Sequence, residues 1–145
     1  MQTLNTDATV AILNKIMQYE LAGVVRYTHS ALMVRGPFRA PIVQFMQSQA
    51  AESLQHAQQA GEILTGLGGH PDQGISPIEE THQHAITDLL KEALAHEQAA
   101  LSLYKDLLGV VADASVYLEE YARGMIGQEE LHTMELQKML RDYEH

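Results

Sequence analysis

The sequence predicts an all-α fold of four long helices in one domain, residues 1–145, with two antiparallel helical hairpins joined by a long crossover. Three observations support this prediction. Most of the Gly, Pro, Asp and Ser residues that interrupt helices fall in only three segments, 35–41, 66–77 and 109–115. Between these segments, apolar residues recur at steps of three and four, as on the buried face of a helix. No segment alternates polar and apolar residues, or gathers β-branched residues, as a strand does.

The first two helices are expected over about residues 7–34 and 41–67. Thr6 or Asp7 is the expected N-cap of the first helix, because either side chain can accept a hydrogen bond from a backbone N–H of the first turn. Pro41 is expected at the first position of the second helix, where its missing N–H costs no hydrogen bond. Gly68 and Gly69 follow this helix as a stop signal.

The third helix is expected to begin between residues 77 and 86 and to end near 108, and the fourth to cover about 115–142. The sequence SPIE, residues 76–79, has the form of a capping box, so the third helix either starts there or follows a separate turn. The crossover must span roughly 40 Å, the length of a helix of about 27 residues. Residues 68–83 reach about 50 Å when extended, which is sufficient if the third helix starts late.

Each helix carries an apolar stripe that holds one Glu near its middle, and two of the stripes also hold a His. The spacing of these residues repeats: Glu20 and Glu52 are 32 residues apart, as are Glu97 and Glu129. Tyr27 and Tyr104 follow seven residues after the first Glu of each pair. The pattern indicates an internal repeat of two helical hairpins. The candidate site residues are Glu20, Glu52, His56, Glu97, Glu129 and His132.

Four buried carboxylates that face one another need counter-charge, because each loses its hydration and repels the others. None of the nine Lys and Arg residues lies on the four stripes. Two divalent cations would balance the carboxylates, with the two imidazoles as further ligands. The chain has no Cys, so any metal must be held by carboxylate and imidazole groups. The alternatives are a partly exposed polar stripe or a buried cluster of protonated carboxyl groups.

This arrangement matches the ligand pattern of ferritin-like di-iron and di-manganese proteins, with a Glu from each of two helices and a Glu-x-x-His from each of the others. The segments YELAGVVRYTHSA (19–31), LAHEQAALSLY (94–104) and QEELHTMEL (128–136) resemble ligand segments of the bacterioferritin branch. The resemblance implies a ferritin-like four-helix bundle that holds two iron ions per chain, with manganese as an alternative. It implies that Glu20 and Glu97 are terminal carboxylates, Glu52 and Glu129 bridging carboxylates, His56 and His132 nitrogen ligands, and Tyr27 a neighbour of the metals.

The chain departs from this family in three places. Glu52 and His56 are four residues apart where the family motif has three, so Glu52 or Ser53 occupies the ligand position, and the 32-residue spacing favours Glu52. Haem is not expected, because residues 53–55 hold no counterpart of the family's haem-binding Met. The sequence ends soon after the fourth helix, without the short helix that lines the channels of 24-subunit cages, which favours a dimer or a smaller shell.

The composition bears on partners and on location. A net charge of −10 argues against nucleic acid and favours cations. No apolar run is long enough to span a membrane, and the N-terminus does not resemble a signal peptide, so the cytoplasm is the expected location. Apolar residues outside the stripes, such as Val25, Leu32 and Val43, predict a homo-oligomer, at least a dimer.

Three histidines, His82, His84 and His96, lie outside the stripes and are expected on the surface or in loops, with iron entry near the first two as an alternative. The resemblance implies a ferroxidase that oxidises Fe(II) to Fe(III) with O2 or peroxide, for iron storage or detoxification. One alternative is a di-iron or di-manganese peroxidase or oxygenase that stores no metal. Another is a helical scaffold that binds metal only structurally or not at all.

Overall fold

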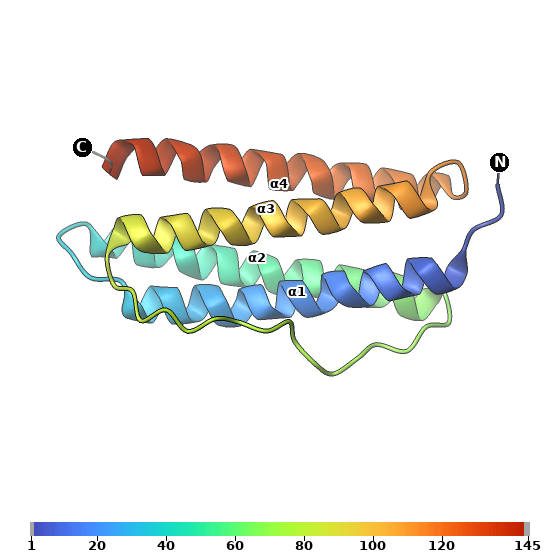
Figure 1. Cartoon of the computed structure of the whole chain (residues 1–145), viewed down its shortest axis with the longest axis horizontal. Coiled ribbons are helices and arrows are strands. Elements are labelled where there is room, and N and C mark those ends of the chain that lie inside the picture. The colour runs from blue at the N-terminus through green and yellow to red at the C-terminus, as the bar shows by residue number, and fades with distance from the viewer. Residues whose placement is uncertain (1, 144–145) are drawn as a thin grey trace.

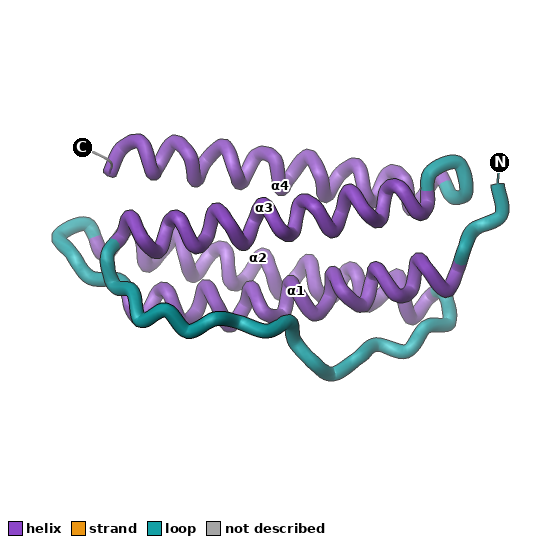
Figure 2. The backbone as a smooth tube through the Cα atoms, viewed as in Figure 1, coloured by secondary structure: helices purple, strands orange, loops and turns teal. Residues whose placement is uncertain are grey.

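The computed structural model describes residues 2–143, and it confirms the all-α prediction. Four helices make up most of the described chain: α1 (Thr6–Met33), α2 (Arg39–Gly66), α3 (Ile86–Val111) and α4 (Val116–Tyr143) (Figure 1). Short turns join α1 to α2 and α3 to α4, whereas residues 67–85 form the long crossover (Figure 2). Among the described residues, no helix is long and apolar enough to cross a membrane.

The four helices form two antiparallel hairpins that pack face to face. α1 packs most closely against α2, α3 packs against α4, and the two hairpins meet mainly through α1 and α3. Because α2 and α3 run in the same direction, the crossover returns along the full length of the bundle (Figure 1). This is the arrangement of two antiparallel hairpins joined by a long crossover that the sequence predicts.

The starts of α1 and α2 differ slightly from the sequence prediction, and the structure decides between the two starts that the sequence allowed for α3. α2 begins at Arg39, so Pro41 is its third residue and not its first. Asn5 is the N-cap of α1, and its side chain accepts a hydrogen bond of 3.1 Å from the Ala8 N–H, so the prediction of Thr6 or Asp7 was wrong. α3 begins only at Ile86, and the capping-box sequence at residues 76–79 lies in the extended crossover. There the Ser76 N–H donates a hydrogen bond to the Gln18 carbonyl of α1, so this backbone is tied to α1 and does not start a helix.

The apolar core has two parts, one toward each end of the bundle. Leu13, Leu64 and Leu107 belong to the first part, and Met46 and Leu90 to the second. All five side chains are completely buried. The core is interrupted near the middle of the helices, where the buried side chains are polar.

Candidate metal centre

The polar residues on the four stripes meet in this central region. Glu20 on α1, Glu97 on α3 and Glu129 on α4 are all buried, and Glu129 is only 1% exposed. His56 on α2 is buried as well, and His132 on α4 is mostly buried. The helices therefore bring five of the six predicted ligands into the core, where charged groups are costly unless they are paired.

Glu20, His56 and Glu129 form one group able to hold a metal ion, with one ligand atom of each within 4.8 Å of the others. His56 turns its Nδ1 toward the carboxylates, 2.8 Å from Glu20 Oε2 and 3.8 Å from Glu129 Oε1. All three residues are buried, and they come from three different helices.

Glu97, Glu129 and His132 form a second such group. His132 also turns its Nδ1 inward, 3.8 Å from Glu97 Oε2 and 3.7 Å from Glu129 Oε2. These distances exceed the hydrogen-bond range, and both His132 Nδ1 and Glu129 Oε2 are buried without a hydrogen-bond partner among the described residues. Two orphaned ligand atoms that face each other fit a position for a cation between them.

Glu129 belongs to both groups, and each of its oxygens faces a different histidine. A carboxylate shared in this way is suited to bridge two cations. The donors are oxygen and nitrogen atoms only, a set that suits iron, manganese and zinc. The buried Glu and His clusters are therefore consistent with a dinuclear metal site.

Tyr27 and Tyr104 hold the two outer carboxylates in place across the hairpins. The Tyr27 hydroxyl on α1 donates a hydrogen bond to Glu97 on α3. In the mirrored contact, the Tyr104 hydroxyl on α3 donates to Glu20 Oε2 on α1 at 2.8 Å. Both rings are buried, and this crossed arrangement follows from the repeat in the sequence, where each Tyr lies seven residues after a Glu.

Glu52, the sixth predicted ligand, lies at the solvent side of the centre. Its side chain is 32% exposed, and its Oε1 lies 3.2 Å from His132 Nε2 and 3.7 Å from His56 Nε2. Ser53, the other candidate for this position, is buried. The carboxylate of Glu52 thus faces the outer nitrogens of the two histidines, whereas the other three Glu residues face their inner nitrogens.

The buried Glu and His residues of the centre change one another's pKa. Burial raises the pKa of the Glu129 carboxyl well above its usual range, so this group holds a proton near neutral pH. Burial opposes the ionisation of Glu97 too, but His132, Glu129 and Tyr27 together outweigh it, and the pKa of Glu97 is lowered. Glu129, followed by Glu52 and Glu97, raises the pKa of the His132 imidazole to about 12. Protons therefore supply part of the counter-charge that bound metals would supply.

His96 contradicts the prediction that it lies on the surface or in a loop. It is 4% exposed, stacks on Tyr19 at a ring-centroid distance of 4.4 Å, and touches the edge of Tyr27. Burial lowers the pKa of His96 to about 4, so its ring is neutral. One signal in the sequence points to this position: Tyr19 and His96 each directly precede a predicted ligand, Glu20 or Glu97, so the repeat pairs them across the two hairpins.

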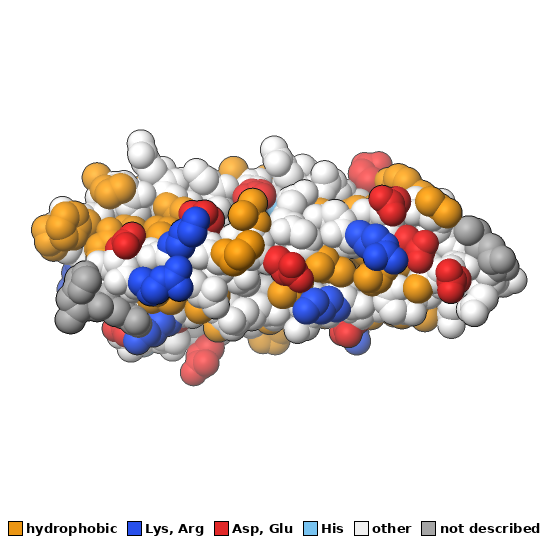
Figure 3. Space-filling model, turned by 90° about the horizontal axis from the view of Figure 1, so that it is seen from above, with side chains coloured by type: hydrophobic (Ala, Val, Ile, Leu, Met, Phe, Trp, Pro, Cys, Tyr) orange, Lys and Arg blue, Asp and Glu red, His pale blue; other side chains and the backbone are white. Residues whose placement is uncertain are grey.

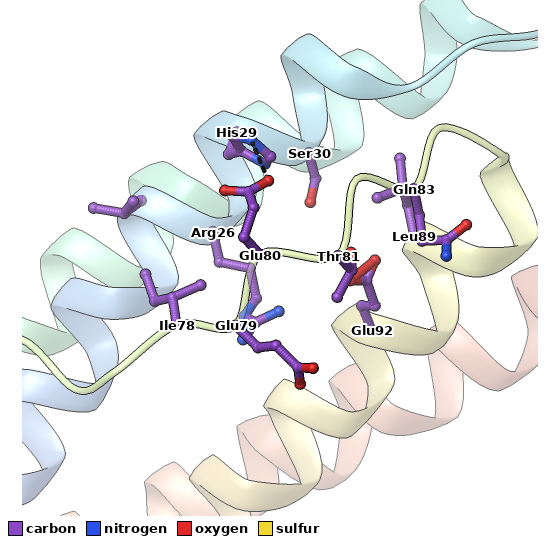
Figure 4. A pocket seen from close by; sticks show the side chains of 11 residues that line it. Arg26, His29, Ser30, Ile78, Glu79, Glu80, Thr81, Gln83, Leu89 and Glu92 are labelled. Atoms are coloured by element: carbon purple, nitrogen blue, oxygen red, sulfur yellow. Dashed lines mark hydrogen bonds and ion pairs between the residues drawn. The ribbon is translucent and has the colours of Figure 1, made fainter.

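A separate cavity of about 140 Å³ lies between the crossover, α1 and α3. Its walls include Arg26 and His29 from α1, Glu80 from the crossover and Glu92 from α3 (Figure 4). At its edge, His29 Nε2 lies 3.4 Å from Glu80 Oε1, the pair that the dashed line in Figure 4 marks. None of the predicted metal ligands lines this cavity, so it is distinct from the central site.

Solved structures share the fold at low sequence identity. A ferritin-like diiron-carboxylate protein from Bacillus anthracis is similar with a TM-score of 0.88 and 22% identity, covering 96% of this chain and 99% of that one. A bacterioferritin-related protein from Bacteroides fragilis, described as a dodecameric thioferritin, gives 0.89 and 22%, covering 97% and 88%. The bacterioferritin of Rhodobacter capsulatus gives 0.83 and 21%, covering 98% and 88%.

Comparison with curated protein sequences finds no significant match. The family model for the ferritin-like domain, however, matches residues 10–145, which include α2, α3, α4 and all but the first turn of α1. This match covers nearly the whole chain and agrees with the fold and with the buried Glu and His residues. The chain therefore belongs to the ferritin family, as a protein with a ferritin-like domain.

Proposed function

We propose that this protein is a ferroxidase that oxidises Fe(II) to Fe(III) with O2 or peroxide. The observation that supports the proposal most strongly is that Glu129 is shared by two buried groups of metal-binding side chains. A site of this kind can hold two ions side by side. Two Fe(II) ions give up one electron each, and with two protons this pair reduces O2 to hydrogen peroxide or hydrogen peroxide to water.

Each residue of the centre has a defined task in this proposal. Glu20 and His56 bind one Fe(II), Glu97 and His132 bind the other, and Glu129 lies between the two positions. Tyr27 and Tyr104 keep the outer carboxylates oriented through their hydrogen bonds. Iron is the metal we propose, and manganese, which the same donors suit, is the alternative.

Iron storage or detoxification is the physiological role we propose, carried out by a homo-oligomer. Leu32 is 75% exposed and Val25 is also exposed, and both lie on α1. Exposed apolar side chains of this kind favour contact with a second copy. Figure 3 shows apolar, acidic and basic side chains interspersed on one face, which does not resemble the single-sign basic surface that binds nucleic acid. The dodecameric thioferritin from Bacteroides fragilis has the same fold and is a precedent for an assembly of many copies.

The test is an anaerobic titration of metal-free protein with Fe(II), followed by admission of O2 or peroxide while ferric absorbance is recorded. We expect rapid oxidation of two Fe(II) per chain. Glu129→Gln should slow this phase by about 100-fold or more, because removing a ligand costs at least as much as removing a hydrogen-bond partner of a ligand. Glu130→Gln is the matched control, since Glu130 is the exposed neighbour of Glu129 and should leave the rate unchanged.

Two results would count against parts of this proposal. Oxidation at the rate of free Fe(II) in buffer would exclude ferroxidase activity. Oxidation that is fast but never exceeds two Fe(II) per chain would exclude storage and favour a peroxidase or oxygenase that keeps its metals.

A further inference from the structure

The two histidines of the centre share one orientation. In both rings Nδ1 faces the inner carboxylates, 2.8 Å from Glu20 for His56 and 3.7 Å from Glu129 for His132. Nε2 of each ring therefore points outward, between α2 and α4. What these outer nitrogens contact decides how firmly the rings are held.

The outer nitrogen of each histidine faces an oxygen acceptor from the other of the two helices, α2 and α4. Glu52 on α2 places its Oε1 3.2 Å from Nε2 of His132 on α4. Gln128 on α4 places its Oε1 3.1 Å from Nε2 of His56 on α2. Each helix therefore supplies a metal-binding imidazole and also an oxygen that faces the imidazole of the other helix.

The internal repeat explains these reciprocal contacts when His56 of the first hairpin is aligned with His132 of the second. Glu52 and Gln128 both lie four residues before a His, whereas Ser53 and Glu129 both lie three residues before one. Burial agrees with this register: Ser53 is 4% exposed and Glu129 is 1% exposed, while Gln128 is exposed and Glu52 is partly exposed. Glu52 is thus the counterpart of Gln128, and Ser53 is the counterpart of Glu129.

We propose that Glu52 and Gln128 are positioning residues that act through the histidines, and that Glu52 is not a second bridging ligand. A neutral imidazole offers its Nδ1 lone pair to a metal only when its proton is on Nε2. An oxygen that accepts a hydrogen bond from Nε2–H selects this tautomer and fixes the ring plane. The inference rests on the proposed function, and it leaves Glu129 as the one carboxylate between the two metal positions.

The experiment titrates metal-free protein with Co(II), whose visible absorbance reports the ligand environment. It compares the wild type with Glu52→Gln, Glu52→Ala and Gln128→Ala. Because a Gln side chain accepts the same hydrogen bond, as Gln128 itself does, Glu52→Gln should bind two Co(II) per chain with the spectrum and affinity of the wild type. Glu52→Ala should weaken binding by about 10- to 100-fold, and Gln128→Ala should weaken it to a similar extent.

A second measurement reads the tautomer directly. In the Zn(II)-loaded protein, ¹⁵N NMR of the imidazoles should show His56 and His132 protonated at Nε2 in the wild type and in Glu52→Gln. In Glu52→Ala the Nε2 proton of His132 should exchange faster with solvent. Glu52 is partly exposed, so these substitutions leave the core of the bundle intact.

The outcomes separate this inference from the proposed function. If Glu52→Gln binds only one Co(II), or is weakened as much as Glu52→Ala, Glu52 is a ligand and the inference is wrong. If Glu52→Ala matches the wild type in affinity and in Nε2 exchange, the inference is wrong as well, while the two-metal site stands. A wild-type chain that binds fewer than two Co(II) overturns the proposed function, and the inference with it.

Discussion

Glu129 and His132 occupy positions where protons and metal ions compete. Burial raises the pKa of Glu129, and the surrounding carboxylates raise the pKa of His132, so both groups are protonated in the metal-free protein near pH 7. Both must lose that proton to become ligands. We therefore expect Zn(II) binding at pH 7 to release these two protons per chain, with a further contribution from His56, whose pKa Glu20 raises despite burial. The affinity should increase as the pH rises from 6 to 8. Calorimetry in buffers of different ionisation enthalpy measures the number of protons released.

Glu129→Gln provides the control, because it removes one of the two protons. This variant should release about one proton fewer for each chain that binds metal. Binding that releases no protons, or that weakens as the pH rises, would contradict the protonation states inferred for Glu129 and His132.

Most of the residues that gather at the centre could be predicted from the sequence, but their depth in the core could not. Glu20, Glu97 and Glu129 interrupt otherwise apolar stripes, and the 32-residue spacing pairs their helices. Glu52 and Ser53 are neighbours, and steps of three and four from a His both stay on roughly the same face of a helix. Side-chain periodicity alone therefore cannot decide between them, whereas burial and the distances to the imidazoles separate them.

α1 needs Gly23 because the neighbouring helices approach it closely at this point. A Cβ on Gly23 would lie 2.8 Å from His96 Nε2 on α3 and 2.8 Å from Ser53 Oγ on α2. Since His96 is held by its stack on Tyr19, it cannot move away freely. We expect Gly23→Ala to lower the free energy of unfolding by about 1–3 kcal/mol, the typical cost of overpacking. Urea unfolding measures this change.

Gly124→Ala is the matched control for Gly23→Ala. Gly124 also lies inside a long helix, α4, but nothing is found within 4 Å of a Cβ built on it. Without a clash, Ala should raise the free energy of unfolding by about 0.5–1 kcal/mol, because it favours the helix over the unfolded chain. Equal changes in the free energy of unfolding at the two positions would mean that the close approach of α2 and α3 does not require Gly at position 23.

The helices themselves were predictable to within a few residues, because their apolar periodicity is long and interrupted only at Gly- and Pro-rich segments. The start of α3 was less certain, since SPIE at residues 76–79 looks like a helix start from local sequence alone. The need to span the bundle overrides this local signal. The crossover is fixed along α1 by contacts such as those of Asn14 with Asp72 and of His84 with Met33, which no local pattern reveals.

The whole bundle is organised around a polar centre that separates two apolar clusters. The candidate ligands come from all four helices and meet only in the folded chain, so metal ions held by them would stabilise the folded state. At free metal concentrations of 100 times Kd, each site contributes about 2.7 kcal/mol, and two independent sites about 5 kcal/mol. For a chain of this size, that corresponds to a rise in Tm of about 10–20 °C.

Calorimetry with Zn(II) and with a chelator tests this rise, and Glu129→Gln shows where it originates. Because burial keeps Glu129 protonated without metal, the uncharged Gln should replace it with little change in the Tm of the metal-free protein. The same substitution removes the shared ligand, so most of the metal-induced rise should be lost. If instead the variant keeps the full rise, the stabilising ions bind outside the centre, and the two halves of the core are not joined by metal.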